Sequence, residues 1–260
     1  MPIPASPGDQ YVQSLARGLS VITAFDAENP QMTLSEVAER TGLSRATARR
    51  FLHTLVELGF VGSDGRLFTL TPQVLQLGTA YLSGLRLPQV AQPHLEALSV
   101  MLGESTSAAV LDRTSIVYVA RVAARRIMSV NIELGTQFPA FATSMGRVLL
   151  AHLEPDDLAA YFDVADLTAP TPQALDSEAR IRDELEVVRA QGWAVVDQEL
   201  ERGLRSIAVP VLDHRGVVAA INVSAQAIGS AQELVRSSLT QLKTAADDIT
   251  LDLKAVARQR

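Results

Sequence analysis

The sequence predicts an α+β protein of two domains, and two observations carry this prediction. In residues 11–71, three amphipathic helical patterns are followed by two short β-prone runs around an Asp-Gly turn. In residues 88–260, helical and strand patterns alternate in a way that favours a mostly antiparallel sheet. We expect residues 72–87 to form a linker helix between the domains and residues 1–10 to form a flexible tail.

The composition limits the kinds of site that this chain can build. Its 260 residues include no cysteine, which excludes disulfides, thiolate metal ligands and a cysteine nucleophile. The net charge of −6 argues against a protein that coats nucleic acid through bulk charge, although a small DNA-reading surface needs only local positive charge. No apolar run is long enough to span a bilayer, and the polar start lacks the features of a signal peptide. We therefore expect a cytoplasmic protein with no metal and no cofactor.

The first two helices are predicted from apolar spacing and from capping residues. Residues 14–25 carry apolar side chains at helical spacing, with Ser14 as the expected N-cap. The second helix is expected to begin after Thr33, because Glu36 stands three residues later in the pattern of a capping box. It should end at Gly42, since glycine accepts the left-handed backbone that terminates many helices.

The third helix and the hairpin complete a winged helix-turn-helix pattern. Ser44 is the expected N-cap of a helix over residues 45–58, whose apolar residues lie on one face. Residues 60–70 then form two β-prone runs, and Asp64–Gly65 between them is a strong turn signal. Helix, helix, turn, helix and hairpin in about 60 residues is the layout of a winged helix-turn-helix.

The C-terminal part is expected to begin at Pro88, which we interpret as a boundary. The expected helices are residues 90–102, 144–153, 156–162, 176–191 and 231–257. The expected strands are residues 108–111, 116–122, 127–132, 194–196, 206–212 and 217–224. Residues 165–172 are expected to form a loop, and no internal repeat is present.

The third helix is the candidate DNA-reading element. A helix that reads DNA inserts its N-terminal end into the major groove and needs long hydrogen-bond donors on its outer face. Arginine can donate two hydrogen bonds to guanine, and hydroxyls or helix amides can bind phosphate. A solvated basic helix face is the alternative for any single arginine. The candidate DNA contacts are Ser44, Arg45, Thr47, Arg49, Arg50 and, beside the hairpin turn, Arg66.

Four blocks of the chain resemble IclR-family regulators: residues 11–22, 34–61, 141–151, and 192–199 with 203–211. The resemblance extends from about residue 11 to about residue 255 and is closest to the Pca/Pob branch, which controls aromatic-acid catabolism through the β-ketoadipate pathway. It implies a winged-helix domain joined by a helix to a GAF-like effector-binding domain. It also implies homodimers, often paired into tetramers, that bind palindromic double-stranded DNA operators and respond to small organic or aromatic acids.

The same resemblance implies an effector pocket against the C-terminal sheet. Ser144 and Met145 would offer backbone amides at a helix N-terminus, which suit a carboxylate. Asp197 matches an acidic pocket residue, and Ser206 a small polar one. The matched positions on the last strand, which share one face of the sheet, are Asn222 and Ser224.

Each of these pocket residues has a second interpretation. Asp197 could instead cap a turn, and the strand pair Asn222 and Ser224 could lie on an exposed sheet face, although burying asparagine without a partner is costly. Arginine binds carboxylates in a bidentate fork. Candidate carboxylate partners are therefore Arg147, Arg205 and Arg121, with a surface ion pair as the alternative that we favour for Arg121.

Two other functions are alternatives to a ligand-sensing regulator. An enzyme is disfavoured, because none of the four histidines lies in a hydrolase or metalloprotease motif. A DNA-binding protein whose C-terminal domain only drives assembly remains the second alternative. By resemblance the candidate effectors are β-ketoadipate, protocatechuate and 4-hydroxybenzoate. We hypothesise that the effector biases the linker helix and so changes the spacing of paired winged helices.

Overall fold

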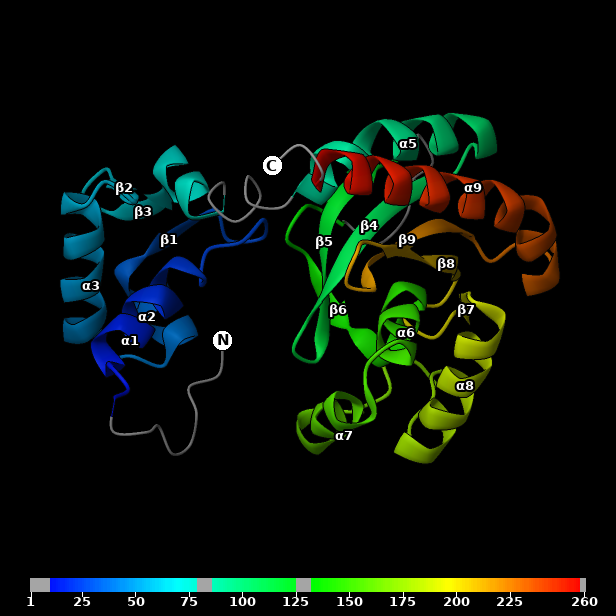
Figure 1. The fold of residues 1–260 in the computed structure, drawn as a ribbon. Coiled ribbons are helices and arrows are strands. Elements are labelled where there is room, and N and C mark those ends of the chain that lie inside the picture. The colour runs from blue at the N-terminus through cyan, green and yellow to red at the C-terminus, as the bar shows by residue number, and fades with distance from the viewer. Residues whose placement is uncertain (1–9, 79–85, 125–131, 258–260) are drawn as a thin grey trace. The chain divides into compact units, whose positions relative to one another are not determined.

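A computed structural model describes residues 10–78, 86–124 and 132–257 (Figure 1). The chain forms two compact units, Met1–Gly84 and Leu85–Arg260, which we describe one at a time. Within the described part of the chain, no helix is both long and apolar enough to cross a membrane.

The N-terminal unit packs three helices against a small three-stranded sheet. Strand β3 lies between β1 and β2, and both pairings are antiparallel. Val21, Met32, Val37 and Leu52 are among the side chains buried at its centre. The elements are α1 (Gln13–Ile22), β1 (Gln31–Thr33), α2 (Leu34–Thr41), α3 (Arg45–Glu57), β2 (Val61–Ser63), β3 (Leu67–Leu70) and the 3-10 turn η1 (Pro72–Val74).

The capping residues explain where α2 and α3 begin. The Thr33 hydroxyl accepts a hydrogen bond from the Glu36 amide while the Glu36 carboxylate accepts one from the Thr33 amide, which confirms the capping box. Gly42 ends α2 with a left-handed φ of 66°, and Ser44 caps α3. The winged helix-turn-helix is therefore confirmed in its three helices and its hairpin.

Two details of this unit differ from the prediction. Helix α1 begins at Gln13, and Ser14 lies inside it; the carbonyl of Val12 accepts from the amides of Leu15 and Ala16, so no side-chain cap is needed. Strand β1 was not predicted. Three residues directly after Asn29–Pro30 are too few to show alternation, and the strand exists because β3 offers it an edge.

The C-terminal unit is built on a six-stranded antiparallel sheet in the order β6-β5-β4-β9-β8-β7. This confirms the α+β class with an antiparallel sheet. Its strands are β4 (Ser105–Asp112), β5 (Ser115–Val122), β6 (Gln137–Pro139), β7 (Ala194–Asp197), β8 (Leu204–Leu212) and β9 (Val217–Gln226). Its helices are α5 (Arg86–Leu102), the 3-10 turn η2 (Ala140–Ala142), α6 (Ser144–Ala151), α7 (Pro155–Val164), α8 (Glu178–Gln191) and α9 (Ala231–Ala257).

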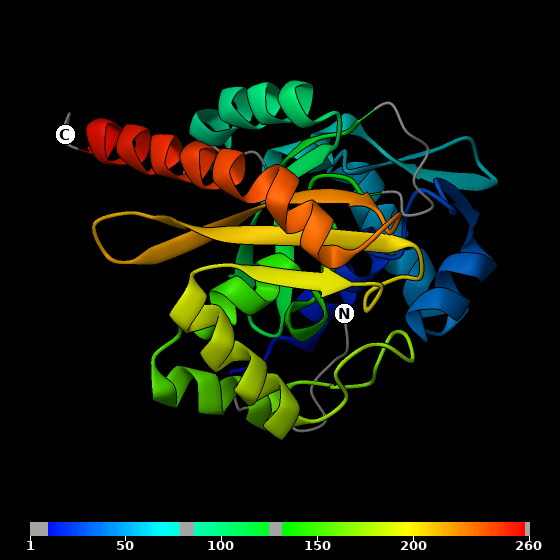
Figure 2. The same ribbon diagram turned by 90° about the vertical axis from the view of Figure 1, so that its right-hand side faces the viewer.

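Helices cover both faces of this sheet (Figure 2). Helices α5 and α9 cover one face, where Leu95 and Leu242 pack against Ile207 and Ile221. Helices α6, α7 and α8 belong to the other side, where α6 packs against residues such as Ala208. Because side chains alternate along a strand, every second residue of β8 and β9 points toward α6. We call this side the α6 face.

Several boundaries differ from the prediction, each for a local reason. Helix α5 already begins at Arg86, so Pro88 does not precede it; proline is tolerated in a first helical turn, whose amides have no partner inside the helix. Strand β4 begins at Ser105 rather than Ala108. The polar residues at the start of this strand can be buried because their hydroxyl groups form hydrogen bonds inside the fold. The Thr106 hydroxyl, for example, donates to the carbonyl of Leu95 at 2.8 Å.

Two predicted elements fall partly outside the described residues. Of the linker helix over residues 72–87, residues 79–85 lie outside. Within the described part, residues 72–74 form η1, residues 75–78 are α-helical as predicted, and residues 86 and 87 belong to α5. Of the strand over residues 127–132, Ile132 alone is described, and it belongs to no strand. Strand β6, which was not predicted, pairs with β5 through only three residues.

Candidate functional site

Helix α3 presents arginines on the side opposite its buried residues. Ala48, Leu52 and Leu55 are buried against the rest of the N-terminal unit. The arginines Arg45, Arg49 and Arg50 are exposed. Within the described part of the chain, none of the three takes part in an ion pair. Their charges are therefore available to a polyanion.

The N-terminus of α3 is ordered by two hydroxyl side chains. The Ser44 hydroxyl accepts from the Thr47 amide at 3.2 Å, and the two hydroxyl oxygens are 2.9 Å apart. The first amides of an α-helix have no partner inside the helix and can bind a phosphate oxygen. This end of α3 can therefore accept an anion beside the arginines.

Arg66 follows the turn of the hairpin and is exposed. The Asp64 carboxylate accepts hydrogen bonds from the amides of Leu67 and Arg66, at 2.7 and 2.8 Å, and these bonds lower the pKa of Asp64. Gly65 between them has a φ of 95°, a conformation that favours glycine. The turn thus fixes the backbone from which the Arg66 side chain extends.

A small cavity lies on the α6 face of the C-terminal sheet. About 10 Å³ of it is open to a water-sized sphere, which is at the lower limit for one water molecule. An organic acid would therefore require the walls to move. The cavity is lined by Tyr118, Ala142, Thr143, Ser144, Val196, Leu200, Leu204, Ser206, Asn222 and Ser224.

The strand register explains why these polar residues meet. Asn222 and Ser224 are two residues apart on β9 and therefore point to the same side of the sheet. Ser206 pairs with Ser224 across β8 and β9, and Val196 pairs with Ser206 across β7 and β8. A row of neighbouring strands thus brings three hydroxyl and amide side chains under the start of α6.

The polar groups of the cavity are buried and only partly satisfied. The Ser144 and Ser206 hydroxyl oxygens share a hydrogen bond of 2.8 Å. Asn222, which is 3% exposed, donates from Nδ2 to the Ser224 hydroxyl at 3.0 Å. The Asn222 Oδ1 atom is buried and has no hydrogen-bond partner among the residues that the structure describes. The alternative that this strand pair lies on an exposed sheet face is therefore wrong.

The start of α6 is held close to the preceding turn. Thr143 caps the helix by accepting from the Gly146 amide at 3.0 Å. A Cβ atom on Gly146 would lie 2.1 Å from the Ala140 carbonyl oxygen, so only glycine fits there. The Ser144 side chain lines the cavity, whereas the Met145 side chain is buried away from it. Met145 can therefore contribute a backbone amide but no side-chain contact to the cavity.

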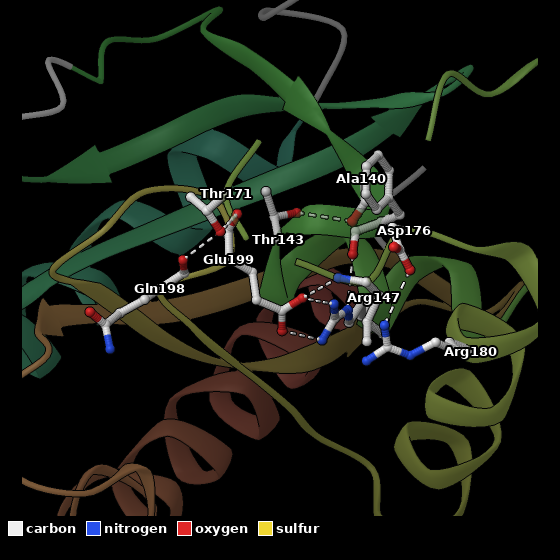
Figure 3. A network of polar contacts seen from close by, with 10 residues as sticks. Ala140, Thr143, Arg147, Thr171, Asp176, Arg180, Gln198 and Glu199 are labelled. Carbon is white, nitrogen blue, oxygen red and sulfur yellow. Dashed lines mark hydrogen bonds and ion pairs between the residues drawn. The ribbon is translucent and has the colours of Figure 1, made fainter. Parts of the chain in front are cut away.

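Two of the three candidate carboxylate partners are already paired inside the protein. Arg147 is 2% exposed and binds the Glu199 carboxylate at both terminal nitrogens, at 2.9 and 2.5 Å (Figure 3). Arg205 donates to Asp197 at 2.8 Å. The interpretation of Arg147 and Arg205 as free partners for a ligand is therefore wrong, because each already neutralises a protein carboxylate.

Asp197 does not lie among the cavity residues. It precedes the turn into β8 and pairs with Arg205 on the side of the sheet opposite Ser206. Its neighbour Val196 lines the cavity in its place. Successive side chains of a strand point to opposite sides of the sheet. Because Asp197 points away from the cavity, it is not part of the proposed site.

Arg121, the third candidate, is half-buried on β5 and donates to the Ser107 hydroxyl at 3.3 Å. The surface ion pair that we favoured for it is not present within the described residues. Sequence reasoning also missed several wall residues. Strand alternation could have indicated Tyr118 and Val196, whereas no sequence signal marks Leu200 or Leu204.

Two family models match this chain. The model for the C-terminal domain of the bacterial transcriptional regulator IclR matches residues 79–251, and the model for the IclR helix-turn-helix domain matches residues 14–65. The chain belongs to the IclR family. Both units of this IclR-family protein are thereby assigned, the first as its DNA-binding domain and the second as its effector-binding domain.

Curated relatives identify a branch of the family. The protein is 47% identical over 234 residues to the Pca regulon regulatory protein of Pseudomonas putida, covering 86% of this chain and 80% of that one. It is 37% identical over 224 residues to the p-hydroxybenzoate hydroxylase transcriptional activator of Acinetobacter baylyi, covering 84% and 83%. These similarities place the IclR-family protein in the Pca/Pob branch.

Solved structures agree with this assignment. A transcriptional regulator from Rhodococcus sp. RHA1 is 52% identical, with a TM-score of 0.82 over 95% of this chain and all of that one. An IclR homologue from Microbacterium hydrocarbonoxydans, solved with 4-hydroxybenzoate, is 25% identical, with a TM-score of 0.81 over 94% of this chain and all of that one.

Proposed function

We propose that this IclR-family protein binds a palindromic DNA operator as a homodimer or tetramer in the cytoplasm and changes its activity when a small carboxylic acid binds its C-terminal domain. The observation that supports a ligand is Asn222, which lines the cavity and whose buried Oδ1 atom has no hydrogen-bond partner within the described part of the chain. Burying such an acceptor unpaired costs about 1–3 kcal/mol. A ligand or water that donates a hydrogen bond to it would remove this cost.

The relatives suggest the class of genes and ligands. One is the Pca regulon regulatory protein, another is the transcriptional activator for p-hydroxybenzoate hydroxylase, and a third was solved with 4-hydroxybenzoate. We propose that this protein likewise controls genes for aromatic-acid degradation. The apolar wall residues Tyr118, Leu200 and Leu204 suit a carbon skeleton, and the serines suit its polar substituents.

On DNA, we propose that α3 enters the major groove. Arg45, Arg49 and Arg50 would contact base edges or phosphates, and Ser44 and Thr47 would hold the helix start beside a phosphate. Arg66, from the hairpin, would contact the backbone or a minor groove. Their exposure and the lack of ion pairs on the α3 arginines within the described residues support this proposal.

We favour a regulator over an enzyme because the cavity serines lack an activating base. Ser144 and Ser206 share a hydrogen bond with each other, and neither bonds a histidine or a carboxylate in the described residues. A second candidate function is a C-terminal domain that serves only for assembly. The cavity in its present form, which barely admits one water molecule, favours that alternative.

A thermal shift experiment separates these two functions. A ligand that binds only the folded protein raises its stability by RT ln(1 + [L]/Kd). We expect one acid in a panel of aromatic and aliphatic carboxylic acids to raise the melting temperature of the wild-type protein, and Asn222→Ala to lose the shift. Asn29→Ala, an asparagine of the N-terminal unit, is the matched control and should keep it. No shift with any acid would favour the assembly role.

A further inference from the structure

Helices α5 and α9 lie side by side on the face of the sheet opposite α6 (Figures 1 and 2). Polar contacts join the start of α5 to the end of α9. Arg86 donates to the carbonyl of Val256, and the Nε2 atom of His94 lies 2.8 Å from an Asp252 carboxylate oxygen. The two helices therefore run antiparallel and are held together at this end.

Further along the same two helices, a groove of about 250 Å³ lies between them. Leu98 and Ala245, which line it, are buried, and Met101, which also lines it, is largely exposed. Ala97 and Thr244 present short side chains, so the space between the helices is not filled. An apolar cavity of about 150 Å³ can hold benzene. The groove therefore has room for one aromatic ring with substituents.

Gln241 gives this groove a hydrogen-bond acceptor that is not satisfied. Its side chain lines the groove, and its Oε1 atom is buried with no hydrogen-bond partner in the part of the chain that the structure describes. Leaving a buried acceptor unpaired is costly, and a ligand that places a hydroxyl or an N–H group here removes that cost. A carboxylate cannot do so, because it has no hydrogen to donate.

Asp248 gives the groove a negative charge at a second position. It is exposed, and within residues 10–78, 86–124 and 132–257 its carboxylate forms no ion pair. It attracts a cation and repels a carboxylate. Seven residues separate Gln241 from Asp248, which corresponds to about 10 Å along a helix axis. The two polar positions therefore suit the two ends of one ligand.

We infer that the groove between α5 and α9 is a second small-molecule site, and that its ligand is an amine with an apolar body and a hydrogen-bond donor at the opposite end. The ammonium group faces Asp248, the apolar body lies against Ala97 and Ala245, and the donor binds the Oε1 atom of Gln241. The groove and the cavity of the α6 face lie on opposite faces of the sheet, so this inference does not rest on the proposed effector site.

The test is a titration of the full-length protein with three molecules of similar size, followed by ligand-observed NMR. Tyramine carries both polar groups, 2-phenylethylamine lacks the hydroxyl, and 4-ethylphenol lacks the ammonium. We expect tyramine to bind about threefold or more tightly than either analogue, as one hydrogen bond or one exposed ion pair allows. Gln241→Leu should give tyramine the affinity of 2-phenylethylamine, and Asp248→Asn should give it the affinity of 4-ethylphenol.

Two matched variants locate the site. Ala97→Leu places a larger side chain in the groove and should weaken tyramine about tenfold or more. Ala159→Leu makes the same change at an exposed position of α7 and should bind tyramine as wild type does. Asn222→Ala, which alters the cavity of the α6 face, should also leave tyramine binding unchanged. Failure of the effector site and failure of this inference are thereby distinguishable.

Three results would overturn the inference. The first is a wild-type protein that does not bind tyramine. The second is that Gln241→Leu and Asp248→Asn both keep the wild-type preference for tyramine over its analogues. The third is a change in molar mass for Ala97→Leu, measured by light scattering, because the groove would then be an interface between copies of this chain.

Discussion

Arg147 of α6 and Glu199, which follows β7, form a buried bidentate ion pair, with N–O distances of 2.9 and 2.5 Å. The Nε atom of Arg147 also donates to the carbonyl of Phe141, and Glu199 accepts from the amide of Leu175. The Thr171 hydroxyl donates to the Glu199 carbonyl at 2.9 Å (Figure 3). This one pair therefore ties together α6, the turn before it and two loops beside the cavity.

Breaking this pair on one side should destabilise the C-terminal unit. Arg147→Met leaves the Glu199 carboxylate without its partner, and Glu199→Gln leaves the Arg147 guanidinium uncompensated. We expect each variant to lose about 3–5 kcal/mol of unfolding free energy, the typical cost of an orphaned buried charge. Urea unfolding of the C-terminal unit, followed by Trp193 fluorescence, measures this change.

The double variant Arg147→Met with Glu199→Gln is the control for charge. It has no orphaned charge, so it should recover part of the stability that each single variant loses. If the double variant is as unstable as the sum of the two single variants, the pair acts through packing and backbone hydrogen bonds rather than through its charges.

The sequence predicts the elements with strong local signals. The capping box of Thr33 and Glu36, the glycine stop at Gly42 and the Asp64–Gly65 turn all act within a few residues, and the structure confirms each of them. The polar pair on β9 was likewise placed on one face, because alternation along a strand is a local rule.

The features that the sequence misses depend on contacts between distant segments. Whether Arg147 or Arg121 is free depends on Glu199 and Ser107, which are 52 and 14 residues away. Asp197 shows a related limit: neighbouring residues of a strand point to opposite sides of the sheet, so Val196 lines the cavity and Asp197 does not. Short strands such as β1 exist only because a partner strand offers an edge.

Gly146 should be indispensable for the approach of α6 to the turn before it. In Gly146→Ala the added Cβ would meet the Ala140 carbonyl oxygen at 2.1 Å, so the turn must shift. We expect a loss of about 1–3 kcal/mol in unfolding free energy and a loss of the acid-induced thermal shift. Gly78→Ala is the matched control, because its Cβ would meet no atom of the described residues within 4 Å. Equal behaviour of the two variants would contradict this role for Gly146.

The capping box should make the N-terminal unit depend on pH. Hydrogen bonds from the Thr33 amide and hydroxyl lower the pKa of Glu36, with a small contribution from the charge of Arg66. A lowered folded pKa contributes stability above the ordinary value of 4.5, and this contribution is lost as pH falls through the folded value. In calorimetry, Glu36→Gln should have a lower melting temperature than wild type at about pH 7, and the difference should shrink as pH falls below 4.5.

The control for this pH effect is Glu39→Gln, which removes an exposed carboxylate from the same helix. It should show a smaller difference from wild type at every pH, because no capping bond is lost. A difference for Glu36→Gln that stays constant between about pH 7 and pH 3 would mean that the amide cannot replace the carboxylate for reasons of geometry rather than charge.

Arg66 should contribute one phosphate contact to DNA binding. Neutralising a phosphate releases counterions, so each lost contact lowers the slope of log K against log salt by about 0.9 on duplex DNA. We expect Arg66→Ala to bind a duplex of arbitrary sequence more weakly and with a slope reduced by about one, measured by fluorescence anisotropy at several salt concentrations. Arg113→Ala, an exposed arginine at a turn of the C-terminal unit, should keep the wild-type slope. A slope for Arg66→Ala equal to that of wild type would remove the hairpin arginine from the DNA interface and leave α3 as its source of positive charge.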